Sequence, residues 1–283
     1  MRLAIYELVV LFRRLLNLPP YVGGYEGIVL FSANSPIIIS RMKKIFAFLL
    51  PIFLATACLA QETNLQKVVK NPAITPVTRG NPTNWMARHE GFVKQAKAGG
   101  IEILFMGDSI TDNWRSRGKN VWEKSYSTRH AANFGIGGDR TQHVIWRIEH
   151  GELDGLDPKV IVLMIGTNNS NTDSPDQITE GVEKIISDMR EKCPKSKILL
   201  LAIFPRNKPT DTAKQLETIH QVNANLAKLD DGKTLTFLDI NKVFLGDDGK
   251  VHADIMPDFL HPNEHGYQLW ADAMEPTLEK MLK

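Results

Sequence analysis

Ile101-Glu102-Ile103-Leu104-Phe105-Met106, followed at once by Gly107-Asp108-Ser109-Ile110-Thr111, is the stretch that decides the fold. The first six residues form a short, mostly apolar run, which is typical of a strand buried on both faces of a parallel sheet. The run then stops at a small residue, an acid and a hydroxyl. Open α/β sheets gather their ligand-binding groups at the carboxyl ends of the strands. Ser109 is therefore either a functional hydroxyl or only the cap of the next helix, because Ser and Asp are good N-caps.

The rest of the chain repeats this alternation of strand and helix without a break in composition. Apolar runs predict further strands ending at 134 and spanning 160–165, 198–204 and 234–240. Apolar residues at helical spacing predict helices over 84–97, 142–148, 178–190 and 216–229, and a closing helix with Pro262 as its first residue. Strands that alternate with helices predict a single α/β domain over 85–283, with a five-stranded parallel sheet between two layers of helices.

Composition restricts the class of protein. With 283 residues, 43% hydrophobic and 23% charged, the chain is globular. A net charge of +2, without a basic stripe, argues against a nucleic-acid partner. The two cysteines cannot build a disulfide framework, and Cys193, beside Pro194 near a helix end, is expected to be structural.

The first 84 residues are predicted to lie outside the domain. Met42-Lys43-Lys44 and the apolar run 45–57 are typical of a secretory signal over 42–60, too short for a membrane span. We therefore expect an exported protein, periplasmic or extracellular. Cys58 directly follows Ala57 and also permits a lipid anchor. Our hypothesis is that Met42 is the true start, that 1–41 is an over-extended reading frame, and that 61–84 is a linker.

The strand ends carry the parts of an acyl-transfer site. A glycine turn at 135–139 follows the second strand, Asn168 follows the third, and Asp258-Phe259-Leu260-His261 precedes the closing helix. A serine needs a base to take its proton, and a histidine can be that base when a carboxylate orients it. Asp258 and His261, three residues apart, can pair on one loop.

The oxyanion of a tetrahedral intermediate also needs hydrogen-bond donors. The backbone N–H groups of Ser109 and Gly138 and the side-chain amide of Asn168 are the candidates. Each part by itself has a structural explanation, as a turn, a loop residue or a cap. Their joint appearance favours a catalytic site with Ser109, Asp258 and His261.

These same segments resemble, in order, the four sequence blocks of the SGNH (GDSL) hydrolases. The blocks are Gly107-Asp108-Ser109-Ile110, Asn133-Phe134-Gly135-Ile136-Gly137-Gly138-Asp139, Gly166-Thr167-Asn168-Asn169 and Asp258-Phe259-Leu260-His261. The stretches 141–147 and 204–206 are similar to the platelet-activating-factor acetylhydrolase branch. The resemblance covers about 100–283 and implies a flavodoxin-like α/β/α sandwich.

The resemblance also implies an ester hydrolase with no metal and no cofactor. It carries Ser109 over as nucleophile, Gly138 and Asn168 as oxyanion donors, Asp258 as orienting carboxylate and His261 as base. Three residues beside these are expected to line a small acyl pocket that favours acetyl groups: Ile110, Thr167 and Leu260.

The secretion signal departs from the cytosolic animal enzymes of that branch and favours O-acetyl groups on carbohydrates as the substrate. An alternative is a lipid esterase, acting as a phospholipid acetylhydrolase or a lysophospholipase. An alternative from another class is a non-catalytic carbohydrate-binding surface protein. The oligomeric state is not readable from the sequence.

Two other hydrolase classes fit less well. His261 and His265 have the i,i+4 spacing of metal ligands, with His252 and Asp254 nearby, but His-Glu-x-x-His is absent. An α/β-hydrolase is disfavoured because Thr111 stands where Gly-x-Ser-x-Gly needs its second glycine. The other histidines have no carboxylate at a sequence spacing that would indicate a pair, and they are predicted to be structural: His89, His130, His143, His150 and His220.

Overall fold

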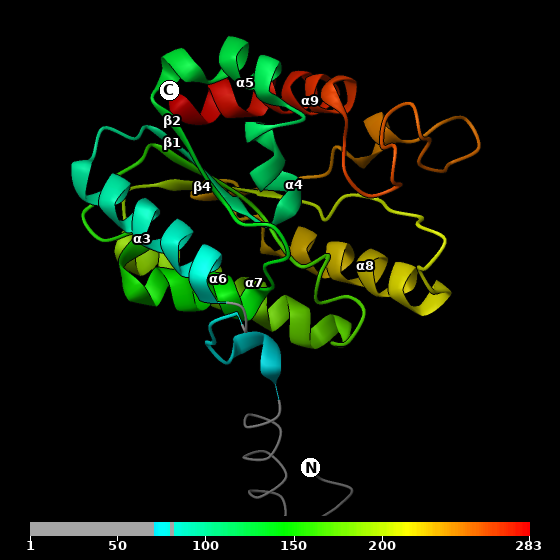
Figure 1. The fold of residues 1–283 in the computed structure, drawn as a ribbon, viewed down its shortest axis with the longest axis horizontal. Helices are drawn as coiled ribbons and strands as arrows, with labels where there is room; N and C mark the ends of the chain where they lie inside the picture. The colour runs from blue at the N-terminus through cyan, green and yellow to red at the C-terminus, as the bar shows by residue number, and fades with distance from the viewer. Residues whose placement is uncertain (1–70, 80–81) are drawn as a thin grey trace, which may run out of the picture. The chain divides into compact units, whose positions relative to one another are not determined.

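The computed structural model describes residues 71–79 and 82–283 (Figure 1). The segments 1–41 and 42–60, with the candidate anchor at Cys58, lie outside the described residues. Five parallel strands form one sheet in the order β2-β1-β3-β4-β5, which confirms the predicted α/β fold. The strands are β1 (Ile103–Gly107), β2 (Ala131–Gly135), β3 (Val160–Met164), β4 (Lys197–Leu201) and β5 (Leu235–Leu238).

Helices cover both faces of the sheet (Figure 1). One layer holds α3 (Pro82–Ala98), α6 (Thr141–Arg147), α7 (Pro175–Lys192) and α8 (Ala213–Leu226). The other holds α5 (Lys119–Ser125) and α9 (Glu264–Leu282), while the short α4 (Ser109–Asp112) follows β1. None of the helices within the described ranges is both long enough and apolar enough to cross a membrane.

The side chains of β1 divide between two hydrophobic cores. Leu104 and Met106 pack into the core beneath the α3, α6, α7 and α8 layer. Ile103 and Phe105 pack into the core beneath α5 and α9. All four are almost fully buried, and each such side chain contributes about 1.5–3 kcal/mol to folding. This two-sided burial explains why the run is continuously apolar instead of alternating.

The start of the closing helix differs from the prediction. Pro262 was expected as the first helical residue, but α9 begins at Glu264 and Asn263 is its N-cap. The side chain of Asn263 accepts a hydrogen bond from the Gly266 N–H at 3.0 Å. Asparagine is a strong N-cap because its side-chain oxygen satisfies one of the first unpaired amides, which the ring of Pro262 cannot do.

Part of the predicted linker packs against the domain. A 3-10 helix, η1 (Pro72–Ile74), lies against α7, and Ala73 within it is fully buried. Asn71 caps η1 and donates its side-chain amide to Glu180 Oε2 on α7 at 2.7 Å. Helix α3 already begins at Pro82, two residues before the expected position. Residues 71–79 therefore carry side chains into the neighbourhood of the sheet edge.

Candidate active site

The order of the strands brings the predicted polar groups together. Strand β1 lies between β2 and β3, and all three run parallel. Their carboxyl ends therefore share one edge of the sheet, with Ser109 after β1 in the middle. Asn168 follows β3 on one side, and Gly138 follows β2 on the other. The sequence predicted this convergence only through the general rule for parallel sheets.

Asp108, and not Ser109, caps the helix that follows β1. Its Oδ1 accepts a hydrogen bond from the Ile110 N–H at 3.0 Å, and Ser109 is the first helical residue of α4. The turn before it requires glycine, since a Cβ on Gly107 would lie 2.3 Å from the carbonyl oxygen of Met164. The Ser109 hydroxyl is therefore not used for capping.

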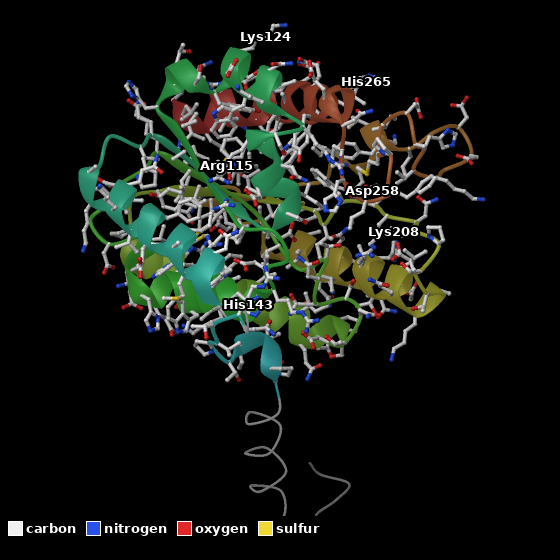
Figure 2. All side chains as sticks on the ribbon, in the orientation of Figure 1. Arg115, Lys124, His143, Lys208, Asp258 and His265 are labelled. Carbon is white, nitrogen blue, oxygen red and sulfur yellow. The ribbon has the colours of Figure 1, made fainter. Side chains whose placement is uncertain are left out.

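The side chains of Ser109, His261 and Asp258 form a continuous chain of hydrogen bonds. Ser109 Oγ lies 2.9 Å from His261 Nε2, and His261 Nδ1 lies 2.7 Å from Asp258 Oδ2. The backbone N–H of His261 donates to Asp258 Oδ1 at 2.8 Å. Between them Phe259 has φ 56°, a left-handed conformation that is uncommon outside glycine. The tight loop before α9, which carries Asp258 (Figure 2), thus directs His261 to the serine and Asp258 to His261.

Arg117 supports this pair from the segment between α4 and α5. Its Nη1 donates to the backbone carbonyl of His261 at 3.2 Å, and its Nη2 lies 3.6 Å from Asp258 Oδ2. Partial burial acts to raise the pKa of Asp258, but hydrogen bonds from the His261 ring and backbone, with the charge of Arg117, lower it to about 2. Asp258 is therefore ionised at neutral pH. Sequence reasoning missed Arg117 because it belongs to no recognisable motif.

The candidate oxyanion donors Gly138 and Asn168 come from different strand ends that are tied together. Gly138 has φ 79°, which favours glycine. Asn168 Nδ2 donates to the backbone carbonyl of Asp139 at 2.8 Å. A side-chain amide carries two N–H donors, so the second remains for a ligand. The structure brings these residues to the same edge as Ser109, and their role as donors stays a prediction.

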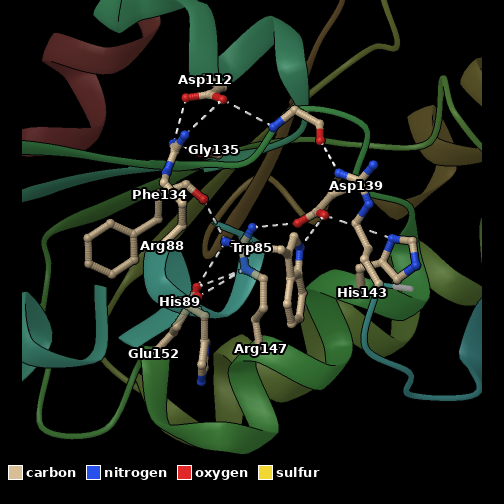
Figure 3. Close-up of polar contacts among 12 residues, drawn as sticks. Trp85, Arg88, His89, Asp112, Phe134, Gly135, Asp139, His143, Arg147 and Glu152 are labelled. Atoms are coloured by element: carbon tan, nitrogen blue, oxygen red, sulfur yellow. Dashed lines mark hydrogen bonds and ion pairs between the residues drawn. The ribbon is translucent and has the colours of Figure 1, made fainter. Parts of the chain in front are cut away.

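Both backbone groups of Gly137 are held by side chains. The N–H of Gly137 donates to Asp112 Oδ2 at 3.1 Å, and its carbonyl accepts a hydrogen bond from Arg79 Nη1. Asp112 is in turn paired with Arg88, whose Nη2 lies 2.6 Å from Asp112 Oδ1 (Figure 3). In a planar trans peptide, C=O and N–H point in opposite directions. Fixing the Gly137 carbonyl therefore fixes the direction of the Gly138 N–H.

A buried ionic network lies behind the glycine turn (Figure 3). Arg147 is fully buried, and it donates from Nη1 to Asp139 Oδ2 at 2.7 Å and from Nε and Nη2 to Glu152 at 2.8–3.0 Å. Its Nη2 also donates to the carbonyl of Phe134. Trp85 Nε1 donates to Asp139 Oδ1 at 2.7 Å. The side chain and the carbonyl of Asp139 are thus both engaged, which immobilises this end of the turn.

One of the histidines predicted to be structural belongs to this network. His89 Nδ1 lies 2.9 Å from Glu152 Oε1, and both side chains are buried. The partner of His89 is 63 residues away in the sequence, so no spacing pattern indicates the pair. His143, on α6, accepts the Arg140 N–H at its Nδ1 and lies 3.8 Å from Asp139 Oδ1.

The three residues expected to line an acyl pocket are all buried. Ile110 and Leu260 belong to the core beneath α9, and Tyr267 donates its hydroxyl to the Ile110 carbonyl at 2.6 Å. Thr167 Oγ1 accepts a hydrogen bond from Arg206 Nη1 at 3.2 Å. Ile110 and Leu260 are therefore packed on the α9 side of the sheet.

The residues considered as metal ligands separate in the structure. His265 is exposed on α9 (Figure 2), while His252 pairs with Asp248 at 2.9 Å. Within residues 71–79 and 82–283, no group of three or more His, Cys, Asp or Glu side chains could hold a metal ion. Cys193 is free and buried, and burial with the nearby Asp157 raises its pKa to about 11, in agreement with a structural role.

A doubly wound sheet with serine, histidine and carboxylate side chains at its edge defines a carboxylic ester hydrolase. The chain belongs to the GDSL-like lipase/acylhydrolase family, whose model matches residues 105–269. It is 35% identical over 218 residues to platelet-activating factor acetylhydrolase IB subunit alpha2 of Rattus norvegicus, covering 75% of this chain and 93% of the relative. The human alpha1 subunit is 34% identical, with 75% and 92% covered.

A solved structure shows the same fold. A GDSL-like lipase from Bacteroides thetaiotaomicron aligns with a TM-score of 0.57 at 16% sequence identity. The alignment covers 69% of this chain and 98% of that protein. The parallel sheet flanked by helices is therefore that of the SGNH hydrolases, as the sequence blocks implied.

Proposed function

We propose that this hydrolase is a serine esterase that releases short acyl groups, acetyl first among them. The observation that carries the proposal is the hydrogen-bond chain from the Ser109 hydroxyl through the His261 ring to the Asp258 carboxylate. A neutral imidazole with its proton on Nδ1 donates to Asp258 and leaves Nε2 free to accept the serine proton. Histidine is the side chain that most readily takes and returns a proton near neutral pH.

In the first step Ser109 Oγ attacks the ester carbonyl carbon, and its proton passes to His261 Nε2. The Asp258 carboxylate stabilises the imidazolium that forms. The N–H groups of Ser109 and Gly138 and the amide of Asn168 bind the oxyanion, and each such donor lowers the barrier by about 3–4 kcal/mol. His261 then protonates the leaving oxygen, the C–O bond breaks and the acyl-enzyme remains. A water that gives its proton to His261 attacks this acyl group, which releases the acid and restores Ser109.

Two observations support acetyl as the acyl group. Ile110, Thr167 and Leu260, which adjoin Ser109, Asn168 and His261 in the sequence, are packed into the protein. A long acyl chain would need such side chains to open a channel. The relatives at 34–35% identity are acetylhydrolases by name. Hydrolysis rates over p-nitrophenyl esters from acetate to octanoate test this, and a preference for octanoate would contradict it.

For the alcohol part we propose O-acetylated carbohydrate. The support is the predicted signal at 42–60, which suits an exported enzyme, with Cys58 as an anchor if the protein is lipidated. A second candidate is an acetylated phospholipid, which the names of the relatives favour. A screen of acetylated glycans and acetylated phospholipids with the chain from residue 61 onward separates the two. N-terminal sequencing and mass analysis of the exported protein test the signal and the anchor.

Labelling with a fluorophosphonate tests the catalytic serine directly. The folded protein should react once, at Ser109, and Ser109→Ala should abolish both labelling and p-nitrophenyl acetate turnover. Ser127→Ala is a matched control, since Ser127 is exposed on the distant segment between α5 and β2. A folded protein that is not labelled and hydrolyses no ester would instead favour the non-catalytic carbohydrate-binding alternative.

A further inference from the structure

A cavity of about 370 Å³ opens beside the glycine turn. Its wall includes Arg79, Trp85, Arg88 and Asp112, and also Gly137 from the glycine turn. A Cβ built on Gly137 would lie 3.7 Å from Ser109 Cβ, so one residue without a side chain separates the cavity from the serine. An ester held at Ser109 can therefore extend its alcohol part across Gly137 into this space.

Arginine dominates the charge around the cavity. Arg88 and Arg115 both pair with Asp112, at 2.6 Å each, so this carboxylate is shared between two cations. Asp139, the other nearby carboxylate, lies behind Trp85 and is paired with Arg147. Within the wall itself the charges of Arg88 and Asp112 therefore cancel, and Arg115, which is not part of the wall, adds a second cation beside Asp112.

Arg79 adds a charge without a carboxylate partner in the described ranges. Its guanidinium lies against Gly138, where a built Cβ would be 2.8 Å from Nη2, and Nη1 donates to the Gly137 carbonyl. The remaining N–H donors of the planar guanidinium can bind an anion. Arg79 also acts on His143, whose pKa is lowered to about 4 by burial first and then by the charges of Arg79, Arg140 and Arg147.

We infer that this cavity is the subsite for the alcohol part of the substrate, and that Arg79, with Arg88, selects alcohols that carry a carboxylate or a phosphate. The inference rests on the proposed ester hydrolysis at Ser109 and names the substrate class of that site. Guanidinium matches the planar geometry of carboxylate and phosphate oxygens, and it holds them with charge-assisted hydrogen bonds. Trp85 and the backbone of Gly137 complete a wall on which the body of the alcohol can rest.

Three aryl acetates that differ mainly in charge test this selection: 4-acetoxybenzoate, its neutral methyl ester and 4-acetoxyphenyltrimethylammonium. Each kcat/KM is divided by the rate constant of alkaline hydrolysis, which corrects for leaving-group ability. We expect the anion to exceed the neutral ester by about tenfold, and the cation to fall below it. High salt should reduce the preference, since ions screen exposed charges.

Substitutions of Arg79 test whether this residue causes the preference for the anionic ester. Arg79→Gln should lower the anion-to-neutral ratio about fivefold or more, while Arg79→Lys, which keeps the charge, should retain most of it. Arg190→Gln is the matched control, because Arg190 is exposed on α7 and pairs with Asp231. An anion-to-neutral ratio that is unchanged in Arg79→Gln overturns the assignment to Arg79.

The outcomes separate this inference from the proposed function. Hydrolysis of the neutral ester with no preference for the anion overturns the inference and leaves the esterase intact. Hydrolysis of none of the three esters overturns both. If Arg79→Gln does not fold, the inference can still be tested with the wild-type protein. Benzoate should inhibit turnover of the neutral ester competitively at a lower concentration than benzamide. Equal inhibition by the two overturns the inference.

Two natural sources could supply the anion, an acidic sugar or a phosphate ester. An acetylated methyl glucuronide compared with the acetylated methyl glucoside tests the carboxylate. Acetyl glycerophosphate compared with acetyl glycerol tests the phosphate. The pair with the larger anion preference identifies the source, and no preference in either pair contradicts the inference.

Discussion

The side-chain amide of Asn168 donates a hydrogen bond to the backbone carbonyl of Asp139 at 2.8 Å. This contact joins the segment after β3 to the turn after β2, across the end of β1 that carries Ser109. The two candidate oxyanion donors are consequently held in one geometry before a substrate arrives. Such preorganisation is what makes hydrogen-bond donors effective on a developing negative charge.

Asn168→Ala should lower kcat by about 10²–10³-fold with a smaller change in KM, because the lost donor acts mainly on the transition state. Steady-state kinetics with p-nitrophenyl acetate measure this. Asn225→Ala on α8 is a control, since its Nδ2 makes only a long contact, 3.5 Å to Thr179, and its Oδ1 accepts from the exposed Lys228 at 2.9 Å. An Asn168→Ala enzyme with normal kcat and a raised KM would show that Asn168 only binds the ground state.

Asp258→Asn should lower kcat/KM by about 10²–10⁴-fold, because an amide cannot stabilise the imidazolium of His261 and can hold the wrong tautomer. The pKa of Asp258 is about 2, so the wild-type carboxylate is charged throughout pH 5–8. The defect should therefore be constant over that range. A defect that vanished toward pH 5 would mean that Asp258 titrates there and that its partners do not hold it ionised.

Asp108 should make the protein less stable as pH rises. Burial first, then the charges of Asp139 and Asp112, raise its pKa to about 7, although the Ile110 N–H and Arg206 oppose the rise. Its Oδ2 is buried and, within the described residues, has no hydrogen-bond partner. With the folded pKa above the unfolded value, the folded state binds the proton more tightly, so stability is lost as pH rises from about 4 through 7.

Asp108→Asn should relieve this loss, because the amide keeps an oxygen that accepts the Ile110 N–H and carries no charge. We expect the Tm of the variant to exceed that of the wild type by a few degrees at pH 8, where ~1 kcal/mol corresponds to about 2–4 °C. The gain should shrink at pH 5. Thermal unfolding at both pH values measures it, and an equal difference at both would argue that Asp108 does not titrate between them.

Arg147→Met should destabilise the fold by about 3–5 kcal/mol, since it leaves the buried carboxylates of Asp139 and Glu152 without their cation. Urea unfolding measures the change, which should be smaller at pH 5, because burial raises the pKa of Asp139 and acid favours its uncharged form. Arg190→Met, which breaks an exposed pair with Asp231, should cost less than about 1 kcal/mol. Similar losses in the two variants would mean that the buried network does not stabilise the glycine turn.

The predicted elements agree with the structure where short-range patterns control them. The run ending at Met106 is a strand because its side chains enter both cores, and Asp258 and His261 pair because three residues of tight loop separate them. The predicted ends of the helices and strands were less accurate. Helix α9 starts later than Pro262 because the side chain of Asn263 provides the cap, which hydrophobic periodicity does not reveal.

Several residues around the site were not predicted, since their partners are distant in the sequence. Arg79 meets Gly137 across 58 residues, His89 meets Glu152 across 63, and Arg117 reaches His261 across 144. No spacing rule relates such pairs. They become neighbours only when the sheet is assembled.

The sequence by itself determined the strand and helix pattern, the serine at the end of the first strand and the Asp258–His261 pair, because these depend on periodicity and on contacts within a few residues. The tertiary structure alone decided that β1 lies between β2 and β3, which sets Gly138 and Asn168 on either side of Ser109. It also decided that Arg79 lies over Gly138 beside an arginine-rich cavity. The physical reason is that the order of parallel strands is set by long-range burial of their faces, and local hydrogen bonding does not encode it.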